Sequence, residues 1–178
     1  MLIQYGTIYG YPISSIGAHV SAVPNQQTGR TVPIRFRADV ACFGTFGYEL
    51  DLNHISEEEF AEVKEQIKFM KQHRQLLQFG TFYRLVSPFE TNMNAWMVVS
   101  EDKTEALVGV YTMRASVNGL DGRIRLAGLD KNKLYHIRSS AYYGDELMQA
   151  GLVLNEENTL DYTQAQDYSS CVICLTAE

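Results

Sequence analysis

The sequence predicts an α+β fold, with helices concentrated in residues 1–81 and an antiparallel β-sandwich in residues 82–178. A long amphipathic pattern with a helix-start signal covers residues 56–79. After residue 82, short runs rich in β-branched and aromatic residues follow one another. The chain has 178 residues, 46% hydrophobic and 20% charged, which is typical of a globular protein of one or two domains.

The first part contains the clearest single element. Residues 56–79 predict a long helix, because Ser56 is a candidate N-cap and Glu59, three residues later, completes a capping box. The apolar residues that recur at helical spacing, and so predict one buried face, are Phe60, Val63, Ile67 and Met70.

Two shorter elements precede this helix. Residues 12–20 predict a strand, and a loop crowded with Pro, Asn, Gln, Thr and Gly follows it. Residues 36–51 mix small residues with aromatic ones, which predicts a short helix that ends in a turn. The first part is therefore expected to hold one strand, one short helix and one long helix.

The second part predicts a sheet. Its strand candidates are FYRLVSPF, AWMVVSE, EALVGVYTM, RIRLAGL, LYHIRS and SSCVICLTA. Residues 100–104 join two of these runs and predict a hairpin loop. In residues 123–126 isoleucine and leucine alternate with arginine, which indicates one solvated face. The runs MVV and CVICL are apolar on both faces, so we expect their strands to be central, whereas residues 142–148 predict a turn.

Composition excludes several classes of protein. The net charge of −6 is spread along the chain, which argues against a nucleic-acid-binding protein. No run approaches the length of a membrane helix, and residues 1–12 lack the basic start of a secretory signal. We therefore expect a cytoplasmic protein with no membrane or nucleic-acid partner.

The cysteines do not indicate a disulfide framework or a metal site. There are three, Cys42, Cys171 and Cys174. Cys171 and Cys174 form a C-x-x-C motif, but on a strand residues three apart face opposite sides, and no second pair completes a metal site. We expect buried small side chains here, and we expect no cofactor.

Long stretches of the chain resemble bacterial α-galactosidases of glycoside hydrolase family thirty-six. The stretches that carry the resemblance are YPISSIGAHVSAVPNQQTGR at 11–30, RADVACFGTFGYELDL at 37–52, KEQIKFMKQHRQLLQFG at 64–80, FYRLVSPFE at 82–90, AWMVVSEDKTEALV at 95–108 and YYGDELMQAGL at 142–152. The resemblance covers nearly the whole chain, most densely residues 2–102.

The resemblance implies a place within a larger enzyme. Family members carry a (β/α)8 barrel followed by an antiparallel β-domain, so residues 1–81 correspond to the last strand and helices of a truncated barrel. Such enzymes hydrolyse terminal α-galactosides of the melibiose and raffinose type with retention, and they often form homo-oligomers. The loop after residue 20 would then lie at the end of the barrel where active sites are built.

The same resemblance implies that the catalytic acids are absent. Retaining glycosidases use two carboxylic acids, and in this family the nucleophile lies in a Lys-Trp-Asp motif. The single tryptophan here, Trp96, precedes Met97, and no Ser-Asp pair precedes Gln4, where the family's acid/base aspartate would lie. We therefore expect no catalytic residue in these 178 residues and no activity from the chain alone.

The candidate substrate-binding residues are Ser14, Ser15, His19 and Asn25. At most one of the two serines can face the barrel axis from a strand. His19 has the alternative of a structural histidine, and Asn25 that of turn chemistry. Glu49 and Asp51 look like a carboxylate pair, but we expect a solvated helix end.

Two non-catalytic functions stay open beside this one. The chain is alternatively a carbohydrate-binding β-sandwich, with Tyr135, Tyr142 and Tyr143 as a stacking platform, although tyrosines in strands are usually half-buried packing. The other alternative is an oligomerisation module that associates through apolar surface.

Overall fold

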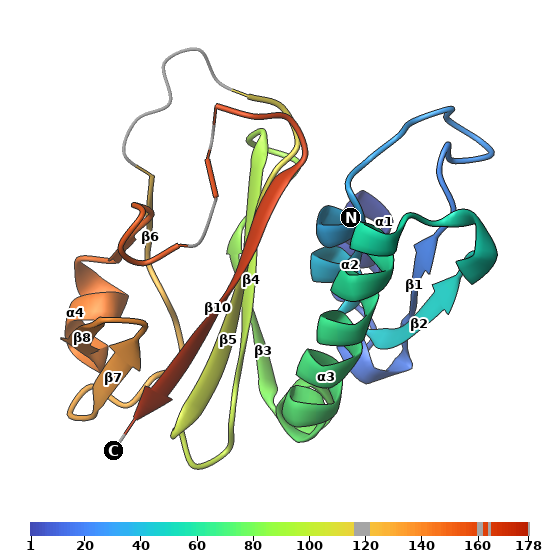
Figure 1. Ribbon diagram of the computed structural model, residues 1–178. Coiled ribbons are helices and arrows are strands. Elements are labelled where there is room, and N and C mark those ends of the chain that lie inside the picture. The colour runs from blue at the N-terminus through green and yellow to red at the C-terminus, as the bar shows by residue number, and fades with distance from the viewer. Residues whose placement is uncertain (116–121, 160–161, 164, 178) are drawn as a thin grey trace. The chain divides into compact units, whose positions relative to one another are not determined.

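The computed structural model describes residues 1–115, 122–159, 162–163 and 165–177 (Figure 1). The chain divides into two compact units, Met1–Gln78 and Phe79–Glu178, which we call unit 1 and unit 2. No helix within the described ranges is both long enough and apolar enough to span a bilayer.

Unit 1 is built around a two-stranded parallel sheet. Its elements are α1 (Leu2–Thr7), η1 (Ile13–Ser15), β1 (Gly17–Ser21), α2 (Ile34–Ala41), β2 (Thr45–Glu49), η2 (Leu52–His54) and α3 (Glu57–Phe79). β1 and β2 pair in parallel, from Gly17 opposite Thr45 to Ser21 opposite Glu49. Parallel strands need a crossover, and α2 supplies it as the helix of a βαβ unit.

Two predictions for unit 1 are corrected, and one helix of unit 1 was not predicted. Residues 36–51 do not end in a turn, because residues 45–49 form β2, where aromatic and small or polar residues alternate with the period of a strand. The strand predicted over residues 12–20 is shorter and later, since residues 13–15 form a 3₁₀ turn. The helix α1 was not predicted, and the sequence offers it no side-chain cap.

The long helix α3 confirms its start signal but not its full buried face. The Glu59 N–H donates to Ser56 Oγ at 3.2 Å, and the Ser56 N–H donates to the Glu59 carboxylate at 3.4 Å. Val63 is buried in the core of unit 1, whereas Phe60 is 40% and Ile67 36% exposed. The reason is that this core is small: α3 contributes only Val63 to it, and Ile67 lines an open groove.

Unit 2 is dominated by a six-stranded antiparallel sheet in the order β3-β4-β5-β10-β7-β8 (Figure 1). Its strands are β3 (Thr81–Val86), β4 (Met93–Val99), β5 (Glu105–Thr112), β7 (Leu134–Ile137), β8 (Ser140–Tyr143) and β10 (Ser169–Ala177). A two-stranded ribbon joins β6 (Arg123–Ile124) to β9 (Leu152–Val153), and α4 spans Gly144–Gln149. The expectation of an antiparallel sheet in the second part is confirmed.

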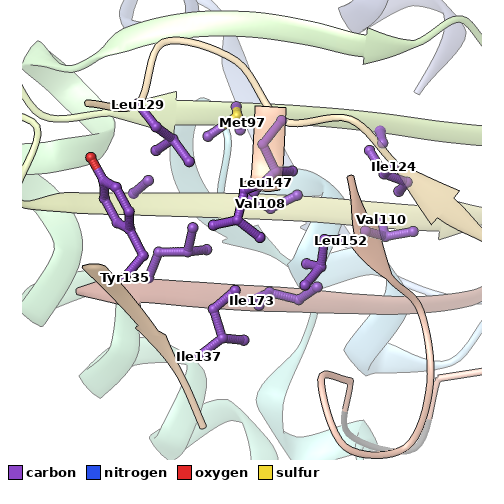
Figure 2. Close-up of a cluster of buried hydrophobic side chains, with 14 of the residues drawn as sticks. Met97, Val108, Val110, Ile124, Leu129, Tyr135, Ile137, Leu147, Leu152 and Ile173 are labelled. Carbon is purple, nitrogen blue, oxygen red and sulfur yellow. The ribbon is translucent and has the colours of Figure 1, made fainter. Parts of the chain in front are cut away.

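The core of unit 2 lies between this sheet, the β6–β9 ribbon and α4 (Figure 2). The buried side chains that meet there include Met97, Val108, Val110, Ile173, Ile124, Leu152 and Leu147. As predicted, the strands with doubly apolar runs are interior in the sheet, and Ile124 and Leu126 are buried while Arg123 and Arg125 are exposed. The predicted hairpin loop at residues 100–104 also joins β4 to β5.

Two predictions for unit 2 are corrected. Residues 144–149 form the helix α4 instead of a turn, because the Glu146 carboxylate accepts the Tyr143 N–H at 2.8 Å and completes a helix start. The side chains of Cys171 and Cys174 diverge as predicted, but Cys174 is exposed, so only Cys42 and Cys171 are buried. β10 alternates its faces at this position.

Candidate functional site

The parallel sheet of unit 1 has one face packed on helices and one open face. Ala18 and Val20 of β1 are buried against residues of α2 and α3, and Phe46 and Tyr48 of β2 pack beside them. Because side chains alternate along a strand, the residues of the open face are Gly17, His19 and Ser21 of β1 and Thr45, Gly47 and Glu49 of β2. The candidate site is the carboxyl end of this open face.

The structure brings His19 and Glu49 together there. His19 Nδ1 lies 3.8 Å from Glu49 Oε2, and both side chains are exposed, at 48% and 72%. Gly47 stands opposite His19, and its lack of a side chain leaves room for the imidazole, since a Cβ at this position would lie 3.2 Å from His19 Cδ2. An exposed pair at this distance contributes little to stability, so its interest lies in its position.

Ser14 and Ser15 lie elsewhere. They sit in η1, before β1 begins, so they are at the amino end of the strand and not on it. The Ser15 hydroxyl donates to the Pro12 carbonyl at 2.8 Å, and the Ser14 carbonyl accepts the Thr45 hydroxyl at 2.9 Å. Five strand residues, about 16 Å of extended chain, separate them from the loop after Ser21. The four predicted site residues therefore do not form one cluster.

Asn25 organises the loop that follows β1. Its side-chain oxygen accepts hydrogen bonds from the Gln27 N–H at 3.1 Å and from the Thr28 N–H and hydroxyl at 3.0 Å each. Its own N–H donates to the Arg30 carbonyl at 2.8 Å. The carbonyl oxygen of this amide is thus engaged in turn chemistry within the loop.

Arg37, which the sequence reading did not single out, contacts both ends of the same loop. Its Nη1 donates to the Ser21 carbonyl at 2.5 Å, and its Nε donates to the Val32 carbonyl at 3.0 Å. A third contact joins Nη2 to Glu59 Oε1 at 3.4 Å. The sequence could not indicate these contacts, because two of the three acceptors are backbone carbonyls, which every residue carries.

Glu49 and Asp51 separate into different roles. Glu49 ends a strand and is not at a helix end, which corrects the expectation for that residue. Asp51 caps η2 by accepting the Asn53 N–H at 2.9 Å, and this hydrogen bond is the main reason that the pKa of Asp51 is lowered. The two carboxylates that look like a pair in the sequence therefore make different contacts, Glu49 with His19 and Asp51 with Asn53.

No described residues form a metal-binding cluster of histidine, cysteine, aspartate or glutamate. The proposed tyrosine platform in unit 2 is also not formed. Tyr135 is fully buried, Tyr142 is half-buried, and Tyr143 is 51% exposed and adjacent to Tyr142 on a strand, so these two face opposite sides. These three tyrosines therefore do not form one platform, and the packing alternative holds for Tyr135 and Tyr142.

Both units match models of known protein families. The Melibiase family model matches residues 1–80, and the model of the glycosyl hydrolase family 36 C-terminal domain matches residues 93–175. The α-galactosidase AgaA of Geobacillus stearothermophilus is 53% identical over 153 residues, which are 85% of this chain and 21% of AgaA. The bifunctional α-galactosidase/sucrose kinase AgaSK of Mediterraneibacter gnavus is 46% identical over 85% of this chain and 16% of its own length.

Solved structures extend the likeness to the fold. A crystal structure of AgaA superimposes with a TM-score of 0.91 at 48% identity, covering 99% of this chain and 24% of that one. The α-galactosidase of Lactobacillus brevis superimposes with a TM-score of 0.90 at 43% identity over the same shares. Variants of AgaA have been solved with raffinose and with stachyose. The chain spans less than a quarter of these relatives, and it belongs to glycoside hydrolase family 36, where it corresponds to a C-terminal portion of the α-galactosidases.

Proposed function

We propose that this chain supplies the C-terminal part of a retaining α-galactosidase that removes terminal galactose from sugars of the raffinose and melibiose type. The observation that carries the proposal is that two models of one family match both units in the family's order. AgaA variants bind raffinose and stachyose, which supports this class of substrate for the whole enzyme.

We propose that residues 1–81 close a (β/α)8 barrel and that residues 82–178 form its C-terminal β-sandwich. In support, β1, α2, β2 and α3 are two consecutive strand–helix units with parallel strands. Parallel sheets usually have both faces covered, yet here one face is open. A groove of about 370 Å³ runs between β2 and α3, and a hollow of about 240 Å³ lies beside β1, α1 and α2, so both flanks of the sheet have space for further strands.

For the second domain, the six-stranded sheet is one layer of the proposed sandwich. The β6–β9 ribbon, which shares the core with that sheet, is the second and smaller layer. The proposed domain boundary, after residue 81, lies close to the division between the two compact units, which falls after Gln78.

Within the proposed barrel, His19, Glu49 and the loop around Asn25 stand at the carboxyl ends of β1 and β2, the end where such barrels bind substrate. Ser14 and Ser15 lie at the opposite end of β1 and are not part of this proposal. The chain supplies no catalytic carboxylate in this account, since no aspartate follows its single tryptophan.

Two assays test the function. The purified chain should not release nitrophenol from an aryl α-galactoside. A chimera in which these 178 residues replace the matching segment of AgaA should hydrolyse it, because AgaA then contributes the remainder of the barrel. Turnover by the isolated chain would refute the absence of catalytic acids, and a folded but inactive chimera would refute the proposed function.

We also propose that the chain self-associates and that it resides in a reducing compartment such as the cytoplasm. Apolar side chains on and after α1 are exposed, with Ile3 at 87%, Tyr9 at 67% and Tyr11 at 66%, and exposed apolar surface favours association. In the part of the chain that the structure describes, Cys42, Cys171 and Cys174 are not joined in disulfides, as is usual for proteins of reducing compartments. Light scattering coupled to size-exclusion chromatography tests the association, and a monomer at all concentrations would refute it.

A further inference from the structure

Residues 22–33 form a long polar loop between β1 and α2 that has internal order. The Asn25 N–H donates to the Arg30 carbonyl, and the Gly29 N–H donates to the Asn25 carbonyl, both at 2.8 Å. These bonds fix the conformation of the loop tip. They do not fix the loop relative to the sheet, so a second set of contacts must set its direction.

Arg37 provides that second set. This side chain projects from α2 and is only 12% exposed. Its guanidinium holds the Ser21 carbonyl, where the loop begins, and the Val32 carbonyl, where it ends. A single planar group therefore closes the base of the loop from both sides.

The third guanidinium contact anchors this closure to α3. Glu59 Oε1 lies 3.4 Å from Arg37 Nη2, and the same carboxylate also accepts the Ser56 N–H in the capping box. Burial lowers the pKa of Arg37, and the nearby charges of Glu59 and Glu62 partly offset this effect. A guanidinium group stays protonated in proteins, so Arg37 is a cation. The start of α3 and the base of the loop are thus joined through one half-buried ion pair.

Lysine cannot reproduce this arrangement. The guanidinium presents its N–H donors in a rigid fork, which suits three acceptors that lie in different directions. An ammonium group has a single nitrogen on a flexible stem, and it would retain at most part of the contacts.

We infer that Arg37 is a positioning residue of the α-galactosidase: it sets the loop of residues 22–33 at the carboxyl end of β1, so that the loop forms part of the wall of the sugar site. This inference rests on the proposed function, because only the barrel places that end of β1 beside a substrate. Arg37 itself touches no substrate in this account.

Trypsin tests the closure in the isolated chain. Arg30 is an exposed cleavage site within the loop, and Arg74, an exposed residue of α3, is an internal reference in the same molecule. The Arg37→Ala variant should be cleaved after Arg30 at least about ten times faster than the parent, with cleavage after Arg74 unchanged, and Arg37→Lys should be intermediate. Equal acceleration at both sites, or no acceleration at Arg30, would overturn the inference.

The AgaA chimera then tests the effect on the sugar site. Since the loop contributes binding groups and no reacting group, Arg37→Ala should raise KM about tenfold with kcat within about twofold, and Arg37→Lys should recover part of the loss. General misfolding would instead lower kcat at constant KM, and that result or an unchanged KM would overturn the inference. Arg125→Ala, which removes an exposed arginine of unit 2, is the matched control and should change neither constant.

The two proposals fail in distinguishable ways. If the parent chimera is folded but inactive, the proposed function fails, and the inference about the sugar site fails with it. If the parent chimera is active and Arg37→Ala behaves like the parent, only the role of Arg37 is refuted.

Discussion

Replacing Tyr135 by phenylalanine should destabilise unit 2 by about 2 kcal/mol, because one hydroxyl joins two separate turns. Tyr135 Oη donates to the Lys103 carbonyl in the β4–β5 hairpin at 2.8 Å. It also accepts the Asp130 N–H of the turn before β7 at 2.9 Å. The side chain is fully buried, and both of its hydrogen bonds are partly buried. Each lost hydrogen bond costs about 1 kcal/mol, and more if its partner stays dry.

Urea unfolding followed by the fluorescence of Trp96 measures this cost. Trp96 is the single tryptophan, and it is fully buried in β4, so its signal follows unit 2. With a slope near 2 kcal/mol per molar urea, a loss of about 2 kcal/mol moves the midpoint down by about 1 M. Tyr143→Phe is the control, because it removes the same hydroxyl from a tyrosine of unit 2 whose ring is half exposed. A shift below about 0.3 M for Tyr135→Phe, at unchanged slope, would refute the bridging role.

Three further changes have expected outcomes. Gly144→Ala should destabilise unit 2 by about 1–3 kcal/mol in the same urea assay, because a Cβ there would lie 2.1 Å from the Asp130 carbonyl oxygen; a neutral result would show that this turn adapts freely. Ser56→Ala should destabilise α3 by about 1 kcal/mol, because the Glu59 N–H loses the Ser56 hydroxyl as its acceptor. Thermal melts followed by circular dichroism measure this loss, and Ser56→Asp, which keeps an acceptor at the N-cap, should not show it. Burial raises the pKa of Tyr162 to about 12, so the unfolded chain ionises first, and stability should fall as the pH rises from about 10 to 12. Tyr162→Phe should make this fall shallower, and an identical pH profile would contradict the shift.

The elements that could be predicted from sequence are those whose signal is local. The capping box at Ser56 and Glu59 defines the start of α3 from four neighbouring residues. Doubly apolar runs identify the interior strands β4 and β10, because such strands have no solvated face. In both cases the information lies within one short window of the chain.

The elements that were missed depend on contacts outside such a window. β2 has Gly47 between its two aromatic residues, and glycine weakens a strand pattern. Gly44, just before β2, nevertheless sits where a Cβ would lie 2.7 Å from the Ala18 side chain, so close packing on β1 requires a glycine there. The buried face of α3 was overestimated for the same kind of reason, since helical spacing does not reveal how much core is available to cover Ile67.

The candidate site was only partly predictable because its geometry is set by strand register. His19 and Glu49 are far apart in sequence, and they meet because β1 and β2 pair in parallel with His19 opposite Gly47. A slip of one residue in this pairing would turn the side chains of β2 to the other face and replace Glu49 with an apolar neighbour. Residue types alone therefore indicate only a histidine near the end of one predicted strand and a carboxylate farther along the chain. Whether they face the same side depends on the register, which the packing of Ala18, Val20 and Phe46 against the helices selects.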